Sequence, residues 1–162
     1  MAERARSSMT VDEFLGWEDG TDTRYELADG VVRAMAPPDA VHRIVVANLT
    51  AIIHAALRSR PPCRPENAAG LRVNQRTMWQ ADIATTCHPP SREITAPVLV
   101  AEVLSPSTRT HDLGRKLPDY RTLATVREIW LADSERRWLQ RWEPDGERWI
   151  VQDFVGASAF HS

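Results

Sequence analysis

Three residues that lie far apart in the chain have the chemistry to hydrolyse a phosphodiester together: Asp82, Glu102 and Lys116. Lys116 is the only lysine among 20 basic residues, and the other 19 are arginines. A lysine, unlike an arginine, is a compact point charge whose pKa responds to burial, and catalytic sites use that property. Asp82 and Glu102 stand in apolar segments, where a carboxylate is costly to bury unless it is paired or bound to a cation.

If the strands carrying Asp82 and Glu102 are neighbours, the two carboxylates lie side by side at a sheet edge. Crowded carboxylates repel, and one is pushed toward protonation unless a positive charge lies between them. Mg²⁺ suits that position because it prefers oxygen ligands and retains waters. A lysine beside it can position or deprotonate a metal-bound water, or stabilise charge on a phosphate. The set therefore outlines metal-assisted phosphodiester hydrolysis.

A structural interpretation stands beside the catalytic one. Buried arginines, which this chain has in number, could satisfy both Asp82 and Glu102. Lys116 could form a simple surface ion pair with Asp112, four residues earlier on the same helix face. The positions of these groups in the fold decide between the two interpretations.

The hydrophobic pattern predicts the elements that position these residues. Alternating and 3.6-residue periods, with Gly and Pro at the breaks, separate strands from helices. Thr10 and Glu13 have capping-box spacing at the first helix, and Asp39 is a candidate cap for the second. The predicted order is a helix over 11–17, a hairpin over 24–36, a helix over 39–58, strands over 71–73, 82–86 and 98–104, a helix from about 107, a strand over 127–132, and a hairpin over 136–154.

This order predicts an α+β fold with a mixed sheet covered by the long helix. In the last hairpin, a turn at Asp145-Gly146 predicts that Trp142 and Trp149 face each other across the strands. Pro118 follows Lys116 by two residues, so the third helix is expected either to be kinked there or to start late with Pro118 in its first turn.

Length and composition predict one domain over residues 9–162, after a disordered lead over residues 1–8. The net charge of −2 excludes a protein that coats nucleic acid by bulk charge, but not a local basic groove. No apolar run approaches the ~20 residues of a membrane span, and the first residues lack the apolar stretch of a signal peptide. Cys63 and Cys87 fit no metal-binding spacing, so we expect reduced thiols and a cytoplasmic protein.

Several segments together resemble the Uma-type restriction endonucleases, a bacterial family with the PD-(D/E)XK nuclease fold. These segments are MTVDEFLGWE, RYELADGVV, AMAPPDAVHRIVVANL, ADIATT, PVLVAEVLSPSTRTHDLGRKLPDYR and VREIWLAD. The resemblance runs from about Met9 to Phe154. It implies a restriction-endonuclease-like mixed sheet flanked by helices, hydrolysis of DNA with Mg²⁺ or Mn²⁺, and a homodimer.

The resemblance assigns roles residue by residue. Asp82 and Glu102 match the two acidic motif positions and would hold the metal, with help from the Val103 carbonyl. Lys116 matches a lysine supplied by the following helix, and would position the attacking water. Glu26, within YELADG, matches a further acidic position, although it could instead pair with Arg24 or Arg33 across its hairpin.

Substrate contacts are predicted at three further positions. His42 matches a histidine at the start of the long helix, although a lone histidine is more often a capping or surface residue. Arg109 and Arg115 flank the proposed site and suit phosphates.

The chain also departs from the family pattern. Ala81 stands where a proline usually precedes the aspartate, Leu104 stands where the second half-motif would have lysine, and Pro118 interrupts the helix of Lys116. These departures keep open a catalytically inactive binding or assembly protein on a nuclease fold. A hydrolase of RNA or of nucleotides is a third possibility, because the same groups serve any phosphodiester.

Overall fold

A sheet of eight strands forms the centre of the structure, a computed structural model that describes residues 8–156. Residues 1–7, which hold most of the predicted lead, and residues 157–162 lie outside the described part. The elements are α1 (Val11–Leu15), β1 (Tyr25–Ala28), β2 (Val31–Ala34), α2 (Ala40–Ala56), β3 (Arg64–Arg72), β4 (Met78–Thr86), β5 (Pro97–Leu104), α3 (Arg109–His111), the π-helical turn η1 (Asp112–Lys116), α4 (Leu117–Tyr120), β6 (Glu128–Asp133), β7 (Trp138–Asp145) and β8 (Arg148–Val155).

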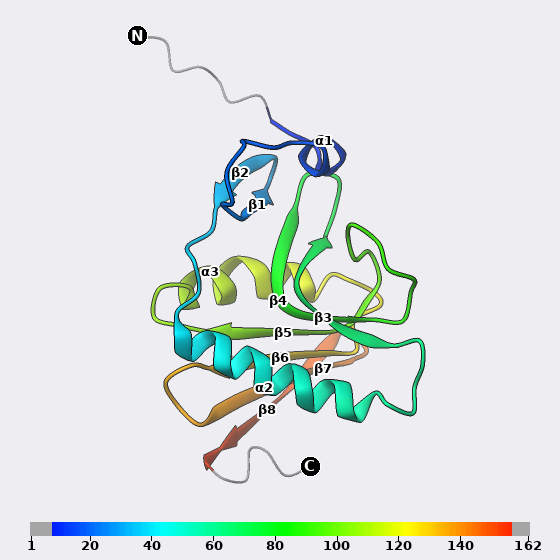
Figure 1. Ribbon diagram of the computed structural model, residues 1–162. Coiled ribbons are helices and arrows are strands. Elements are labelled where there is room, and N and C mark those ends of the chain that lie inside the picture. Colours follow the sequence, from blue (N-terminus) through cyan, green and yellow to red (C-terminus); the bar gives the residue numbers. More distant parts are fainter. Residues whose placement is uncertain (1–7, 157–162) are drawn as a thin grey trace.

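The sheet divides at β4, because two other strands pair with different parts of β4. The strand order is β2-β1-β4-β5-β6-β7-β8, and β3 pairs with β4 along its whole length. Since a strand has two edges, β1 and β5 must share the other edge of β4. β1 meets that edge at Met78 and β5 meets it from Ile83 onward. Between these points the edge of β4 is open, and β1 and β5 diverge from it (Figure 1).

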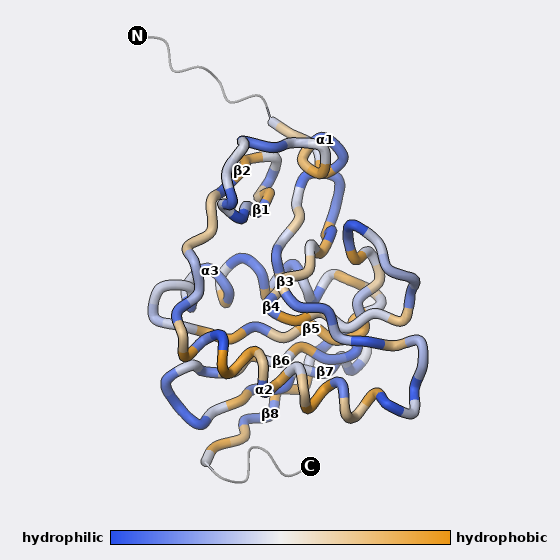
Figure 2. Tube along the Cα trace, viewed as in Figure 1, coloured by the Kyte–Doolittle hydropathy of each residue, from blue (hydrophilic) through white to orange (hydrophobic). Residues whose placement is uncertain are grey.

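Helices cover the sheet on both faces. Leu49 and Ile53 of α2 pack on one face, against Ala101 and Val103 of β5. Leu117 and Tyr120 of α4 pack on the other. Figure 2 shows apolar and polar residues alternating along α2, the pattern of a helix with one buried side. The predicted α+β class, with a mixed sheet flanked by helices, is confirmed. Within residues 8–156, no helix combines the length and apolar character needed to cross a membrane.

The helix after β5 is continuous through Pro118. α3, η1 and α4 follow one another without a break, and the Leu117 N–H donates to the Asp112 carbonyl five residues back, which is a π-helical bond. Proline lacks an N–H, so it is tolerated only in the first turn of a helix. Pro118 stands there, at the start of α4. The wider π-helical turn thus accommodates Pro118 without a break in the helix. Lys116 is the last residue of this turn.

Three strand predictions need correction. β3 begins at Arg64 rather than Leu71, and its first half was missed because it is polar and lacks a clear alternating pattern. β4 begins at Met78 rather than Asp82, so Asp82 lies in the middle of its strand. In the last hairpin, Trp142 pairs with Val151 and Trp149 pairs with Pro144, so the two tryptophans are diagonal neighbours. The reason is the turn. Asp145 pairs with Arg148, so the loop consists of Gly146 and Glu147, one position later than predicted.

The prediction of reduced cysteines was wrong, because Cys63 and Cys87 form a disulfide. The antiparallel register explains it. Arg64 pairs with Thr86 at the end of the β3–β4 ladder, so the next residues along each strand, Cys63 and Cys87, come opposite each other. The spacing of the two cysteines in the sequence did not indicate the disulfide, because the first half of β3, which sets the register, was not predicted.

We expect reduction of this disulfide to destabilise the protein. Cross-linking residues separated by 24 positions restricts the unfolded chain, an effect worth about 3 kcal/mol. Guanidinium unfolding with and without dithiothreitol measures the difference. In the double variant Cys63→Ser/Cys87→Ser the reductant should change nothing. Two reactive thiols in the folded, unreduced protein would contradict the pairing.

Candidate functional site

Asp82 and Glu102 face each other where β4 and β5 part. The last ladder pair of these strands is Ile83 with Ala101, so Asp82 and Glu102 are next in register. The Asp82 N–H donates to Glu102 Oε2 over 3.2 Å, and the Val103 N–H donates to Asp82 Oδ2 over 2.8 Å. Each carboxylate thus takes a backbone N–H of the other strand in place of the missing ladder bond.

Lys116 enters the same gap from the π turn and is only 4% exposed. Its Nζ lies 2.8 Å from Glu26 Oε1, 2.8 Å from the Gln80 carbonyl oxygen and 3.4 Å from Glu102 Oε1. The ammonium group therefore spans all three strands of the fork, β1, β4 and β5. An ammonium has three N–H donors, so these three acceptors use them all.

Asp112 also belongs to this buried group. Its Oδ1 lies 3.7 Å from Lys116 Nζ, and both side chains are buried. The surface ion pair considered for Asp112 and Lys116 is therefore wrong: the helical run lies over the fork and takes both groups out of solvent.

The polar contacts of the Glu26 side chain come from other elements of the site and not from its own hairpin. Its carboxylate receives Lys116 and the Gln80 N–H, and Oε2 lies 3.1 Å from His111 Nε2. Within residues 8–156, Glu26 makes no ion pair with an arginine, so the interpretation with Arg24 or Arg33 is not what the structure shows. The sequence analysis did not single out His111. Its proximity to Glu26 depends on contact between β1 and the helical run, which no local pattern reveals.

Tyr120 is the other contributor that the sequence analysis missed. Its hydroxyl donates to Glu102 Oε1, and the side chain is fully buried. Tyr120 lies four residues after Lys116, so the two share one face of the helical run. That spacing was the available signal, but it is equally typical of a core tyrosine. Leu104, at the motif's lysine position, packs in the core beside Tyr120.

His42 secures the other side of Asp82. Its Nε2 lies 3.0 Å from Asp82 Oδ1, and the ring is largely buried at the start of α2. The Asp39 side chain caps that helix by accepting the His42 N–H over 2.8 Å. His42 is thus neither the cap nor a surface residue. Through it α2 is tied to the carboxylate of β4.

The arginines predicted to contact substrate lie outside this cluster. Arg109 pairs with Asp133 at the end of β6, and Arg115 pairs with Asp29 in the β1–β2 turn at 2.8 Å. Among residues 8–156, no arginine makes an ion pair with Asp82 or Glu102. The structure therefore brings together Asp82, Glu102, Lys116, Glu26 and His42, and it excludes arginine as the partner of the two central carboxylates.

Burial and neighbouring charges shift the pKa values of these groups. Burial raises the pKa of Glu102 well above its ordinary value, and the neighbouring Lys116 does not offset this. Burial also raises the pKa of Asp112. Burial alone would lower the pKa of Lys116, but Glu102, Glu26 and Asp112 outweigh it and raise the pKa, so Lys116 stays charged. The three acceptors around its Nζ thus hold Lys116 as a positive charge inside the fork.

Asp82 behaves in the opposite way to Glu102. Burial raises its pKa, but hydrogen bonds from His42 and from the Val103 N–H outweigh that effect, so the pKa lies below its usual value. The same hydrogen bond raises the pKa of His42, against the effect of burial. The pKa values of Asp82 and Glu102 are therefore shifted in opposite directions, that of Asp82 toward the ionised form and that of Glu102 toward the protonated form.

The donor set fits a hard divalent cation that retains waters. Three carboxylates, those of Glu26, Glu102 and Asp112, surround the Lys116 ammonium group. Asp82 and Glu102 line a cavity of about 190 Å³ together with Ser105, Ser107 and Thr108. Across the described ranges, no three His, Cys, Asp or Glu side chains are arranged to hold a metal by themselves. A cation here would take two carboxylates, a backbone oxygen and water, which is how Mg²⁺ is usually bound.

Comparison with known proteins shows the family and agrees with the fold. Residues 11–160 match the Uma2 family model, described as "Putative restriction endonuclease". The protein slr1290 of Synechocystis is 32% identical over 119 residues, which cover 69% of this chain and 62% of that protein. Another Synechocystis protein, sll1609, is 23% identical over 93% of this chain and 90% of its own length. A crystal structure from Anabaena variabilis, described as a putative nuclease belonging to DUF820, superposes with a TM-score of 0.72 at 17% identity, covering 90% of this chain and 85% of that one.

The raised pKa of Glu102 predicts a pH dependence of stability in metal-free protein. Between the ordinary value of about 4.5 and the raised value, the folded state holds a proton that the unfolded chain has lost. The free energy of unfolding therefore falls as pH rises through this window, by about 1.4 kcal/mol per unit of pKa shift. Urea unfolding in EDTA at several pH values measures it.

In that experiment Glu102→Gln should reduce the slope and leave only the part that Asp112 contributes, and Glu147→Gln, in an exposed turn, should keep the full slope. Equal slopes in the wild type and Glu102→Gln would contradict the assignment of the proton to Glu102.

Proposed function

Since the chain belongs to the Uma2 family, described as "Putative restriction endonuclease", we propose that it is a Mg²⁺-dependent endonuclease that hydrolyses DNA phosphodiester bonds. One observation carries the proposal: Asp82, Glu102 and Lys116 meet in one buried cluster at the fork of the sheet, without any arginine between them. In a purely structural set of ion pairs, the carboxylates need not outnumber the cationic groups. In this cluster they do.

In this proposal Asp82 and Glu102 hold the metal, with the Val103 carbonyl as a third ligand. The bound metal would polarise the phosphodiester and favour ionisation of a water. His42 and the Val103 N–H keep Asp82 ionised and fixed in orientation. Tyr120 fixes Glu102 in the same way from the other side of the fork.

Lys116 supplies a fixed positive charge that positions the attacking water and stabilises the developing negative charge. Of its three contacts, the 3.4 Å bond to Glu102 is the longest and the easiest to exchange for a water or a phosphate oxygen. Glu26 and the Gln80 carbonyl hold the ammonium group from behind, at 2.8 Å each. We assign Glu26 this supporting role in catalysis.

The proposal extends to a homodimer. A cytoplasmic location was expected from reduced thiols, and the Cys63–Cys87 disulfide removes that argument for it. Family resemblance suggests the dimer, and the exposed apolar side chains of Ile150 and Val151 on the outer strand β8 support it. Arg109 and Arg115, which are half-exposed at their ion pairs, would contact phosphates farther along the duplex.

A non-catalytic binding protein is the second candidate, and one observation favours it. All three Lys116 donors are already engaged, and Leu104 leaves no lysine on β5. Such a protein would bind the metal and DNA without cleaving DNA. The same assay separates the two candidates.

We expect purified protein to nick or cut plasmid DNA with Mg²⁺ or Mn²⁺, and EDTA to abolish the activity. Lys116→Ala, Asp82→Asn and Glu102→Gln should each lower the rate at least about 100-fold, the usual cost of losing an electrostatic group from a reaction site. Titration calorimetry should show weaker Mn²⁺ binding to Asp82→Asn. Agarose gels and single-turnover rates measure cleavage.

Arg148→Ala, on the distal hairpin, serves as the control and should cleave as the wild type does. Cleavage by Lys116→Ala at the wild-type rate would remove the lysine from the mechanism. Metal binding with no cleavage by the wild type would favour the non-catalytic candidate.

A further inference from the structure

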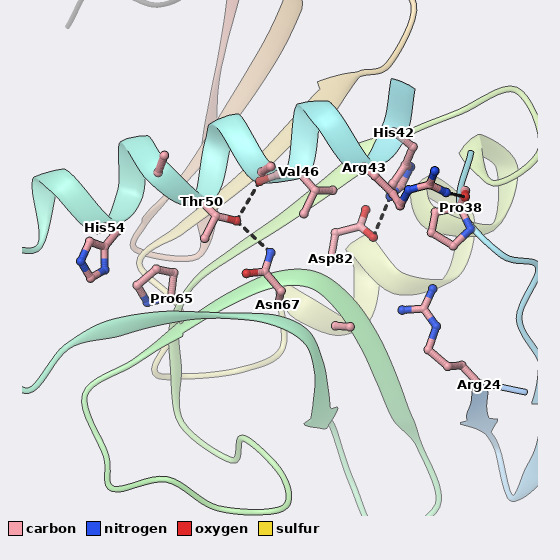
Figure 3. Close-up of a pocket in the computed structure, with 13 residues that line it drawn as sticks. Arg24, Pro38, His42, Arg43, Val46, Thr50, His54, Pro65, Asn67 and Asp82 are labelled. Carbon is pink, nitrogen blue, oxygen red and sulfur yellow. Dashed lines mark hydrogen bonds and ion pairs between the residues drawn. The ribbon is translucent and has the colours of Figure 1, made fainter. Parts of the chain in front are cut away.

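A second and larger cavity opens next to the acidic cluster, on the α2 side of Asp82. It has a volume of about 650 Å³ and lies between α2 and the strands β3 and β4 (Figure 3). Arg24, Pro38, His42 and Asp82 line both this cavity and the smaller acidic one. The two cavities therefore meet at Asp82, and we call the larger one the α2 groove.

Two neighbouring ridges of α2 form one wall of the groove. His42, Val46, Thr50 and His54 recur every fourth residue, and Arg43, Ala47 and Ala51 do so beside them. Twelve residues at 1.5 Å each make this wall about 18 Å long. The hollow exists because alanine stands at two positions of the second ridge, where larger side chains would fill it.

The opposite wall comes from β3. The Asn67 amide donates to the Thr50 hydroxyl over 2.8 Å (Figure 3). Pro65 and Ala68 also line this wall. Ala68 has a φ of 48°, a conformation uncommon for a residue other than glycine. It stands opposite Asp82 in the β3–β4 register but is not paired with it, so the ladder is interrupted beside the groove.

The charge of the groove changes along its length. At the end near Asp82, Arg24 extends toward the junction of the cavities, and within residues 8–156 its guanidinium has no acidic partner. Arg43 donates to the Pro38 carbonyl at the same end. Farther along, the walls are alanine, valine and proline with an amide, a hydroxyl and an imidazole. Cationic groups at the mouth and apolar walls with a few polar groups suit a phosphate followed by a base.

Resting on the proposed function, we infer that the α2 groove binds unpaired nucleotides of the DNA strand on one side of the scissile phosphate. A cavity of this size matches sites that enclose a single small ligand, and a duplex does not fit between a helix and the sheet it covers. Arg24 would bind the phosphate next to the scissile one, and the bases would lie against Ala47 and Ala51 with His54 at the far end. The enzyme would thus prefer substrates with a single-stranded or frayed segment at the cleavage site.

The test measures binding of a short fluorescein-labelled single-stranded DNA by anisotropy, with Ca²⁺ in place of Mg²⁺. Ala51→Trp and Ala47→Trp fill the groove and should each weaken binding at least about tenfold, the equivalent of one lost base contact. Arg24→Ala should reduce the slope of log affinity against log salt by about 0.7, the value for one phosphate contact to a single strand.

Asn48→Trp is the matched control, since it adds the same side chain to the solvent side of α2 and should bind as the wild type does. Thermal melting verifies that each tryptophan variant is folded. Folded Ala51→Trp and Ala47→Trp that bind single strands as tightly as the wild type would overturn the inference. So would wild-type protein that binds a duplex of the same sequence more tightly than the single strand.

Hydrolysis of bis(p-nitrophenyl) phosphate, a phosphodiester with no base, separates this inference from the proposed function. Loss of DNA binding in Ala51→Trp with no hydrolysis by any form would support the groove and refute the nuclease. Hydrolysis of both the small diester and DNA by Ala51→Trp at wild-type rates would support the nuclease and refute the groove.

Discussion

An open stretch on one edge of β4 is the constraint from which the site follows. Where β1 and β5 diverge, β4 and β5 expose backbone N–H groups that no ladder satisfies, and a buried N–H without a partner costs free energy. Asp82 and Glu102 supply acceptors across the gap, each to the other strand. Satisfying the backbone in this way places two carboxylates side by side, and the resulting repulsion requires a cation. Lys116 provides positive charge at the fork, 3.4 Å from Glu102, while burial raises the pKa of Glu102.

The same constraint explains why the single lysine is at position 116. Its ammonium group donates to three acceptors, on β1, β4 and β5, that converge on one point. Tetrahedral N–H donors suit such a point, whereas the planar fork of arginine needs acceptors spread in one plane and more volume. The π turn delivers the side chain there, because the wider turn carries the helix past Pro118 without a break. The proline that seemed to disturb the site is thus part of how the lysine is positioned.

The features that depend on local sequence pattern were predicted correctly. Capping at Thr10 and Asp39 and the α+β order are confirmed. The meeting of Asp82, Glu102 and Lys116 was expected chiefly from the family resemblance, because a buried acid on an apolar strand by itself left the structural interpretation open. What was missed depends on register and on contacts between distant elements. The Cys63–Cys87 pairing, the diagonal placement of Trp142 and Trp149, and the approach of His111 to Glu26 all depend on which residues come opposite each other. A shift of one position in a turn changes these pairs without changing the hydrophobic pattern.

Asp82 stands at the boundary between two environments, and that position bears on its chemistry. On one side lie Glu102 and Lys116 in a small acidic cavity, and on the other lies the α2 groove with Arg24 at its mouth. An acidic cavity alone repels a polyanion. Positive potential beside it attracts the phosphate chain and directs one phosphate toward the carboxylates, where a cation must be present for it to approach. On the proposed function, Asp82 therefore stands where the phosphate chain and a bound cation would meet, held in place by His42 and by the Val103 N–H.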